Sequence, residues 1–287
     1  MRYRLFEMEF EFAGLTDTGK KRKENQDRII LDAKDGFFAV SDGMGGLRRG
    51  GDAAEYVCMS MPGLMGILTE ECGAGTAPEE AAERLKQTAG VLSDTLFRKG
   101  NSPTRFDYGA TLAGVWLYGD RAVFICLGDS RGYRLRKDET ELKQLTEDMN
   151  IAGIMVRNGL MTKSEGARSP SSSRLTAFVG MEEPATPEAY PTEVQEGDIL
   201  LLCSDGLHGL VPERRIGEII RAGETLEAAC GELVKAANAR GGRDNISVIL
   251  IRIGKHKGEA ADAGEEFSDE GRNPDPEEEK STAQEEK

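Results

Sequence analysis

Long runs of apolar residues alternate with amphipathic stretches along the first 254 residues of the chain. The apolar runs are rich in Val, Ile, Leu and Phe, which favour β-strands. Several runs are separated only by a short turn, such as Tyr-Gly-Asp at 118–120, and short turns indicate antiparallel pairing. We predict strands at 5–13, 27–32, 36–41, 110–118, 121–127, 131–136, 198–203 and 246–253.

The amphipathic stretches between these strands predict helices. One helix is expected to open at Thr76, because Thr76 and Glu79 have the spacing of a capping box. Gly241 and Gly242 are suited to closing another helix. Groups of strands interrupted by pairs of helices predict an α+β fold in which helices flank the sheets. The other predicted helices lie at 52–71, 213–221 and 225–240.

Two segments depart from this pattern. Residues 150–190 carry short helical pieces and a Ser-Pro-Ser-Ser-Ser stretch, and such a long excursion inside a domain indicates a functional lid, here called the flap. Residues 255–287 hold 12 Asp and Glu against 5 Lys and Arg, which predicts a disordered acidic tail. We therefore predict one domain at 1–254 followed by a tail at 255–287.

Charge and cysteine usage narrow the function classes. The formal net charge of −14 argues against general affinity for nucleic acid or for anionic membranes. No apolar run approaches the roughly 18 residues that span a bilayer, and the first residues lack the continuous apolar core of a signal peptide. The five cysteines show no CxxC or Cys/His zinc spacing. These features predict a cytoplasmic protein with reduced thiols.

Aspartates stand at the edges of the predicted strands. Asp42, Asp129 and Asp205 follow a strand, whereas Asp27 and Asp244 precede one. Antiparallel strands place the end of one strand beside the start of its neighbour, so these carboxylates can meet at one rim of the sheets. An Asp-Gly pair alone is a common turn signal. The repetition at strand edges favours a shared site instead.

A rim of carboxylates has a specific chemistry. Crowded carboxylates repel one another and raise each other's pKa values. Divalent cations relieve this repulsion, and a set of oxygen ligands favours Mg²⁺ or Mn²⁺. Two such ions about 3.5–4 Å apart acidify a shared water and so generate a nucleophile at neutral pH. A glycine after the aspartate, such as Gly43, allows the backbone to approach closely, so that a carbonyl can join the ligands.

Other catalytic schemes fit the sequence poorly. The chain has two histidines, and His256 stands at the start of the acidic tail, which leaves His208 alone. No GxSxG motif of a serine hydrolase is present. The glycine-rich segment DGMGGLRRGG has Arg48 at the last glycine position of a dinucleotide-binding loop, so that motif fails.

Six segments of the chain resemble a known family. DTGKKRKENQD, AVSDGMGG, GATLAG, CLGDSRGYRL, LCSDGLHGLV and RDNISVIL follow the order and approximate spacing of the metal-dependent protein phosphatases (PPM, or type 2C), in particular bacterial-like members. The resemblance covers about residues 10–253. It implies a four-layer αββα sandwich of two antiparallel sheets. It also implies that a hydroxide bridging two Mn²⁺ or Mg²⁺ ions attacks phosphorus directly, hydrolysing phosphoserine and phosphothreonine in proteins.

The resemblance implies roles for the residues at matching positions. Asp42 would bridge both metals, Gly43 would offer its carbonyl to the first, and Asp205 and Asp244 would hold the second. Arg22 would bind the substrate phosphate, a task suited to a bidentate guanidinium. Without the resemblance, Arg22 would be read as a solvated member of the Lys-Lys-Arg-Lys run.

Further roles are implied around this core. Asp27 would lie close to the metals, Gln26 would act through water and Asn245 would support the metal shell. Asp129 would bind a third, weaker metal. The alternative for Asp129 is a structural ion pair with nearby Arg131.

Three positions depart from the family pattern. Met44 replaces a histidine that some relatives use as a general acid, and Met149 replaces a histidine in the segment leading to the flap. Gly209 stands where many members carry another acidic ligand of the third metal. Gly209 and Met149 leave open a catalytically weak or inactive relative that binds phosphoproteins. A second alternative is another two-metal phosphoesterase such as a nuclease, although the acidic charge and the lack of a basic groove argue against it. The expected partners are phosphorylated proteins and an antagonistic Ser/Thr protein kinase, with the chain itself a monomer.

Overall fold

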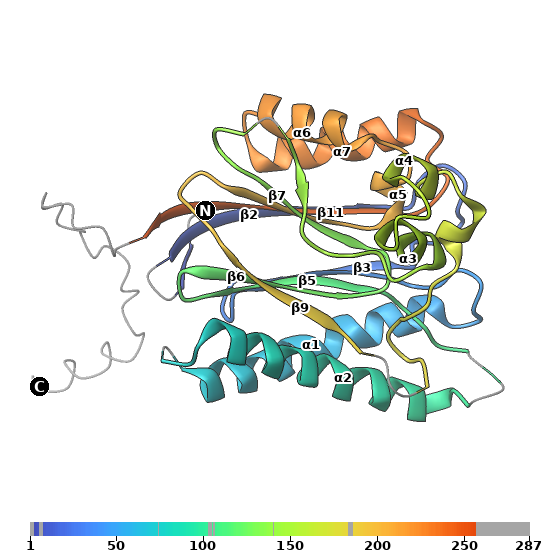
Figure 1. Cartoon of the computed structure of the whole chain (residues 1–287), viewed down its shortest axis with the longest axis horizontal. Helices are drawn as coiled ribbons and strands as arrows, with labels where there is room; N and C mark the ends of the chain where they lie inside the picture. Colours follow the sequence, from blue (N-terminus) through green and yellow to red (C-terminus); the bar gives the residue numbers. More distant parts are fainter. Residues whose placement is uncertain are drawn as a thin grey trace, which may run out of the picture. The chain divides into compact units, whose positions relative to one another are not determined.

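Two antiparallel sheets face each other in the computed structural model, which describes residues 3–5, 8–73, 75–102, 105, 107–139, 141–182 and 186–256 (Figure 1). One sheet has six strands in the order β1-β2-β11-β10-β7-β8, and the other has five in the order β3-β4-β5-β6-β9. Every neighbouring pair is antiparallel, as predicted. The strands are β1 Tyr3–Leu5, β2 Met8–Asp17, β3 Asp27–Asp32, β4 Phe37–Asp42, β5 Leu112–Tyr118, β6 Arg121–Leu127, β7 Arg131–Leu135, β8 Lys143–Gln144, β9 Glu188–Glu193, β10 Ile199–Cys203 and β11 Ile246–His256.

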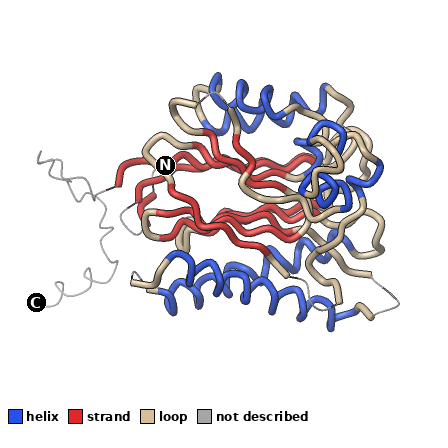
Figure 2. Tube along the Cα trace, viewed as in Figure 1, coloured by secondary structure: helices blue, strands red, loops and turns tan. Residues whose placement is uncertain are grey.

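Helices cover the outer face of each sheet. α1 (Gly50–Cys72) and α2 (Pro78–Gly100) pack on the five-stranded sheet, and α6 (Glu213–Ala222) and α7 (Leu226–Ala239) lie on the six-stranded one. Figure 2 shows the two layers of strands between the two layers of helices. The predicted four-layer αββα arrangement is confirmed. None of the helices among the described residues is long and apolar enough to cross a membrane.

Three apolar cores hold the layers together. One lies between α1, α2 and the five-stranded sheet, one between α6, α7 and the six-stranded sheet, and one between the two sheets. β5 is buried at every position because both of its faces are covered. This explains why its sequence, LAGVWLY, is a continuous apolar run rather than an alternating one.

The structure corrects three sequence predictions about elements. The strand expected at 5–13 is β2, which begins at Met8 and continues to Asp17, because its backbone stays paired with β11 beyond the apolar run. Tyr3–Leu5 form a separate short strand, β1, that pairs with it. The capping box at Thr76 is wrong: the helix begins at Pro78, and the Thr76 hydroxyl instead donates to the carbonyl of Cys72. Strand β9 was not predicted. It is a polar edge strand containing Pro191, a residue that only an edge strand tolerates well.

The predicted flap contains short helices. These are α3 (Ile151–Arg157), α4 (Lys163–Gly166) and a 3₁₀ turn (Pro170–Ser173), and they lie at the same end of the sheets as α5 (Asp205–His208). The flap is fastened at its root, because the Ile151 amide donates to the Arg174 carbonyl at 3.0 Å. The predicted acidic tail lies outside the described residues from residue 257 onward.

Candidate active site

Asp27 and Asp42 lie directly opposite each other at one end of the five-stranded sheet. Asp27 is the first residue of β3 and Asp42 the last of β4, and the antiparallel register pairs them. A hydrogen bond links this pair to the other sheet, because the Ser204 hydroxyl donates to Asp27 Oδ2 at 2.7 Å. Ser204 immediately follows β10 and precedes Asp205. The ends of both sheets therefore meet where the strand-edge aspartates predicted a rim.

The carboxylates at this rim act on one another. The pKa values of Asp42 and Asp205 are raised well above the usual range by burial, and further by the charges of neighbouring aspartates. Burial also raises the pKa of Asp27, although hydrogen bonds with neighbouring hydroxyls and with Asp42 partly offset it. The charge of Asp244 adds to the repulsion felt by all three. The sequence thus places negative charges together, against the normal preference for dispersing them.

Two carboxylate oxygens at the rim have no hydrogen-bond partner. Asp27 Oδ1 and Asp205 Oδ1 are both buried without one among the described residues. A buried charged oxygen without a partner is costly, and it marks a place where a cation or water belongs. These oxygens, and the oxygen-only character of the cluster, fit a hard divalent cation such as Mg²⁺ or Mn²⁺.

The carboxylates at the rim do not close around a single position. In the part of the chain that the structure describes, no three His, Cys, Asp or Glu side chains are gathered tightly enough to hold a metal ion by themselves. Mg²⁺ suits such an arrangement, because it usually keeps several waters and takes only one or two carboxylates from the protein. The residues fit a hydrated ion better than an ion enclosed by side chains.

The glycines after Asp42 and Asp205 are required by close backbone approach. A Cβ at Gly43 would lie 2.5 Å from the carbonyl oxygen of Gly50, and one at Gly206 would lie 1.9 Å from that of Asn245. Neither glycine has a positive φ. This close approach packs the start of α1 and the residue before β11 against the rim, while a metal-ligand role for the Gly43 carbonyl stays a prediction.

Arg22 points into the rim from the loop between β2 and β3. Its Nη2 donates to Asp244 Oδ2 at 2.6 Å, and its charge also acts on Asp42 and Asp205. The guanidinium lies over Gly45, where a Cβ would be only 2.6 Å from Nη1. Arg22 is therefore not simply a solvated member of its basic run, although 41% of its side chain remains exposed.

Asn245 fixes the loop that carries Arg22. Its Nδ2 donates to the carbonyls of Thr18 and Glu24, each at 2.9 Å, and its Oδ1 accepts the amide of Gln26 at 2.9 Å. The Gln26 carbonyl in turn accepts the Gly43 amide at 3.2 Å. Asn245 thus connects the start of β11 to both ends of the loop. Gln26 takes part in this connection through its backbone. Support of a metal shell by Asn245 and a water-mediated role for Gln26 stay predictions.

The sequence did not reveal the role of Thr111. Its hydroxyl accepts the Asp42 amide at 3.0 Å and shares a 2.7 Å hydrogen bond with the Ser130 hydroxyl, next to Asp129. The Thr111 carbonyl accepts the Ser41 hydroxyl at 2.7 Å. This buried threonine therefore holds the Asp42 and Asp129 loops in register. A threonine at the start of an apolar strand gives no such signal by itself.

Asp129 lies at the root of the flap. Asn150 Nδ2 is 3.4 Å from Asp129 Oδ2, and Asn150 Oδ1 caps helix α3 by accepting the Gly153 amide at 2.8 Å. Burial, with the charge of Asp148, raises the pKa of Asp129 to about 6. His208 Nε2 lies 3.0 Å from the Asp129 carbonyl, so this nitrogen carries the proton, while burial lowers the pKa of His208 to about 3.

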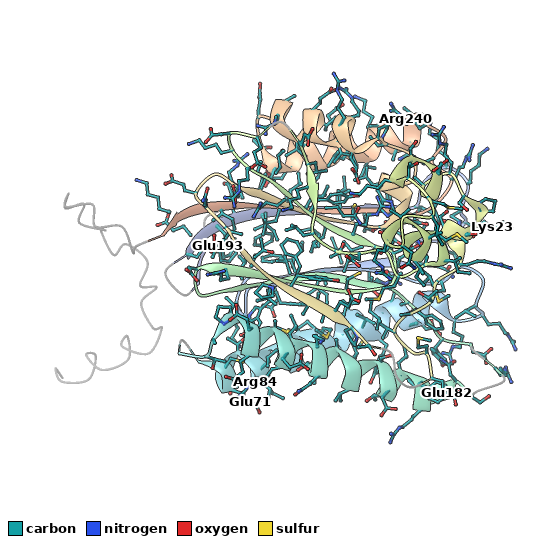
Figure 3. All side chains as sticks on the ribbon, in the orientation of Figure 1. Lys23, Glu71, Arg84, Glu182, Glu193 and Arg240 are labelled. Atoms are coloured by element: carbon teal, nitrogen blue, oxygen red, sulfur yellow. The ribbon has the colours of Figure 1, made fainter. Side chains whose placement is uncertain are left out.

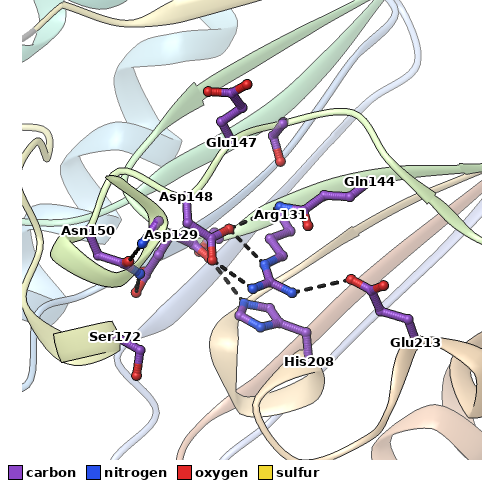
Figure 4. A network of polar contacts seen from close by, with 12 residues as sticks. Asp129, Arg131, Gln144, Glu147, Asp148, Asn150, Ser172, His208 and Glu213 are labelled. Carbon is purple, nitrogen blue, oxygen red and sulfur yellow. Dashed lines mark hydrogen bonds and ion pairs between the residues drawn. The ribbon is translucent and has the colours of Figure 1, made fainter. Parts of the chain in front are cut away.

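Arg131 does not pair with Asp129. It makes a bidentate contact with Asp148, at 2.7 and 2.6 Å, and approaches Glu213 at 3.5 Å. Figure 4 shows Arg131 between these two acids, beside His208. The structural ion pair considered as the alternative for Asp129 is therefore formed by Asp148 instead, 17 positions after Arg131 in the chain.

The three residues that depart from the family pattern lie in different structural surroundings. Met149 is buried in the core under α1 and α2, and its backbone bonds to Gly128 and Thr176 on either side. The Met44 amide donates to the Gly109 carbonyl at 3.0 Å. The Gly209 amide closes α5 by donating to the Asp205 carbonyl at 2.8 Å. Gly209 therefore shapes the turn after Asp205 but brings no carboxylate to Asp129.

Comparisons with known proteins agree on one family. The family model described as "Protein phosphatase 2C" matches residues 18–247. The chain is similar to the serine/threonine phosphatase Stp of Listeria innocua, with 32% identity over 240 residues that cover 82% of this chain and 93% of that protein.

Solved structures give the same picture. The serine/threonine phosphatase of S. agalactiae superposes with a TM-score of 0.74 at 30% identity, covering 85% of this chain and 99% of that one. The catalytic domain of the phosphatase PstP, solved in complex with 2 manganese ions, has a TM-score of 0.68 at 25% identity and covers 86% and 99% of the two chains.

Proposed function

This chain belongs to the protein phosphatase 2C family and is a protein serine/threonine phosphatase, and from that premise we propose how its own residues support the reaction. The reaction is hydrolysis of phosphoserine and phosphothreonine in proteins, with Mn²⁺ or Mg²⁺ as the cofactor. A relative solved with 2 manganese ions supports this cofactor. The observation that carries the proposal is the rim of mutually repelling aspartates with orphaned oxygens on Asp27 and Asp205.

The rim provides the ligands of two cations. Asp42 would contribute to both, the Gly43 carbonyl to the first, and Asp205 and Asp244 to the second. When bound, such a pair of cations neutralises phosphate charge and lowers the pKa of water, which provides the nucleophile. Asp129 would contribute to a third, weaker site. Because Gly209 brings no second carboxylate, that site has fewer protein ligands.

The other residues position these groups and the substrate. Arg22 presents a planar fork of donors that matches two phosphate oxygens, and Gly45 leaves space for it. Asn245 and Thr111 hold the Arg22 loop and the Asp42 loop by the hydrogen bonds described above. Met44 has no titratable group, so protonation of the leaving oxygen falls to water.

The proposal also covers the chain's organisation and partners. Residues 1–254 would form the phosphatase domain, with the flap at 150–190 bordering the site. The chain would act as a monomer. A phosphatase needs a reaction that supplies its substrate, so a Ser/Thr protein kinase would act in opposition. The relatives named as phosphatases favour this function over a nuclease or a binding-only protein.

Phosphate release from a phosphothreonine peptide tests the proposal. We expect turnover in Mn²⁺ and none in EDTA. Asp205→Ala should lower the rate of phosphate release by about 10²–10³-fold or more, because it removes a preorganised carboxylate that would hold the second cation. Asp120→Ala is the control, since Asp120 lies in the β5–β6 turn, away from Thr111 and Asp42. Full activity of Asp205→Ala would contradict the assignment. Peptide binding without turnover in folded wild type would establish the binding-only alternative.

A further inference from the structure

Two loops beside the rim form one continuous surface. The loop at 18–26 lies on the loop at 240–245, because the amides of Lys20 and Lys21 both donate to the Gly242 carbonyl, at 2.8 and 3.2 Å. Contact is so close at Gly19 that a Cβ there would lie 2.2 Å from the Asp244 carbonyl oxygen. Side chains from both loops therefore share one patch of surface.

This patch gathers exposed cations in a chain whose net charge is −14. Lys23 and Arg240, labelled in Figure 3, project from it at the end of the sheets where α5 lies. None of its cations forms an ion pair with a described residue, whereas several cations on the helices do, as in Arg84–Glu80 and Lys235–Glu232. We call the patch the cationic rim, and its exposed members are Lys20, Lys21, Lys23, Arg240 and Arg243.

Acidic residues near the cationic rim do little to neutralise it. The Asp17 carboxylate is occupied by the Gly19 amide at 2.8 Å and by Asn238 Nδ2 at 3.0 Å. Glu24 is the one exposed acid within the 18–26 loop. The backbone contacts hold these exposed like charges close together, where they repel one another. Binding of an anionic partner relieves this repulsion and is therefore favourable.

The cationic rim lies next to the position of the substrate phosphate. Arg22 stands between Lys21 and Lys23 in the chain, and its side chain turns inward to Asp244 while its neighbours are exposed. A phosphoresidue held by Arg22 would carry its flanking residues outward past these lysines. Consecutive Cα atoms are about 3.8 Å apart, so residues within a few positions of the phosphate come within reach.

We propose that the cationic rim makes this phosphatase selective for phosphosites flanked by acidic residues. The inference rests on the proposed function and names the substrate class of that site. Exposed charge pairs contribute little singly, but several in one place steer association and discriminate between partners. A short acidic peptide fits better than nucleic acid or a membrane, because the cationic rim is confined to two loops of an otherwise acidic chain.

Three phosphothreonine peptides with acidic, neutral and basic flanks test the proposal. For wild type in Mn²⁺ we expect kcat/KM to be roughly tenfold higher for the acidic than for the neutral peptide, mainly through KM, if three exposed pairs form. The triple variant Lys21→Gln, Lys23→Gln, Arg243→Gln should reduce this ratio to near one. Raising ionic strength should also reduce it, since exposed charges are screened.

Lys34→Gln is the matched control. Lys34 is exposed in the β3–β4 turn, at the other end of the strands that begin and end at Asp27 and Asp42, so its removal should keep the acidic preference. Equal kcat/KM for the three peptides, or a triple variant that retains the preference, would overturn the proposal while leaving the phosphatase function intact.

Binding measurements separate this proposal from the function itself. Anisotropy of the same labelled peptides reports the preference without turnover, so a wild type that bound the acidic peptide best but released no phosphate would contradict the proposed function and support the cationic rim. Binding to vesicles with anionic lipid and to a single-stranded oligonucleotide is measured as well. Tighter binding of either one through the three substituted residues would overturn the assignment to peptides.

Discussion

Two groups of partly buried acids lie side by side in this protein, and they are neutralised in different ways. Asp148 is held by the bidentate guanidinium of Arg131, and although burial alone would raise its pKa, that contact lowers it. Asp42 and Asp205 have raised pKa values even though the charge of Arg22, which bonds Asp244, acts on both. The first group carries its counter-charge within the chain. The second depends on charge from outside it.

The largest expected difference between the two groups is in stability. Asp148→Asn should lower the free energy of unfolding by about 3–5 kcal/mol, because the Arg131 guanidinium then keeps only the neutral Tyr133 hydroxyl and a longer contact to Glu213. Urea unfolding in EDTA measures the change. The control is Asp94→Asn, whose exposed pair with Arg98 on α2 should be worth about 0.3–0.5 kcal/mol. Equal, small losses of unfolding free energy in both variants would contradict the view that Asp148 is neutralised by Arg131.

Asp42→Asn should have the opposite effect on stability. It removes a repelling charge, so the free energy of unfolding in EDTA should rise, whereas phosphatase activity in Mn²⁺ should fall by about 10²–10³-fold. Calorimetry in EDTA and phosphate release in Mn²⁺ provide the two readings, with Asp120→Asn as the control. A variant that is less stable in EDTA would show that the Asp42 charge is already compensated within the chain.

The pH dependence of stability should also separate Asp148 from Asp129, whose charge acts on Asp42 and Asp205. In EDTA the folded protein takes up a proton at Asp129 near pH 6, whereas an unfolded aspartate does so near pH 3.9. Between about pH 6 and pH 4 the folded state thus binds more protons, and its stability should rise as pH falls, by on the order of 2 kcal/mol. The contribution of Asp148 has the opposite sign and is lost only below about pH 4.

Binding of a divalent cation should reverse this dependence of stability on pH. Ligand carboxylates must be deprotonated to bind metal, so stabilisation by Mn²⁺ should fade as pH falls over the same range. Urea unfolding at a series of pH values, with EDTA and with Mn²⁺, provides both curves. Parallel curves would mean that the cation does not bind at the titrating carboxylates.

Thr111→Val tests the hydrogen bonds that hold the Asp42 loop. It keeps the shape of the side chain but leaves the Asp42 amide and the Ser130 hydroxyl without their shared partner, at a cost of about 1–3 kcal/mol. The matched control is Thr95→Val on α2, where the lost hydrogen bond is exposed and the change should stay within about 0.5 kcal/mol. Thermal unfolding distinguishes the two. Equal effects would remove Thr111 from the list of groups that position Asp42.

The sequence predicted those parts of the molecule that depend on a local pattern. Apolar runs marked most strands, and an aspartate at the end of such a run placed Asp27, Asp42 and Asp205 at one rim. Strand β9 was missed because its alternation is polar and contains a proline. The capping box failed because Pro78 starts the helix and Thr76 bonds to the preceding one.

Partners distant in sequence could not be predicted. Asn150 reaches Asp129 from 21 positions away, and Asn245 reaches Gln26 from 219. An asparagine or a threonine contributes the same polarity to the sequence pattern whether it caps a helix, holds a loop or faces solvent. Which of these it does is decided by the pairing of strands, and only the fold provides that. Arg131 was assigned the wrong candidate partner for the same reason.

Because the two sheets contribute different members of the site, the apolar layer between them acts as a spacer. Asp42 ends a strand of one sheet and Asp205 follows a strand of the other, with Phe38 and Leu202 buried in the layer between. Protein interiors are closely packed and deform little, so the thickness of this layer sets how far apart the two carboxylates are held. Mg²⁺ demands a narrow range of ligand distances. Substitutions deep inside the sandwich would therefore alter which ion this enzyme prefers, without changing a single residue that touches it.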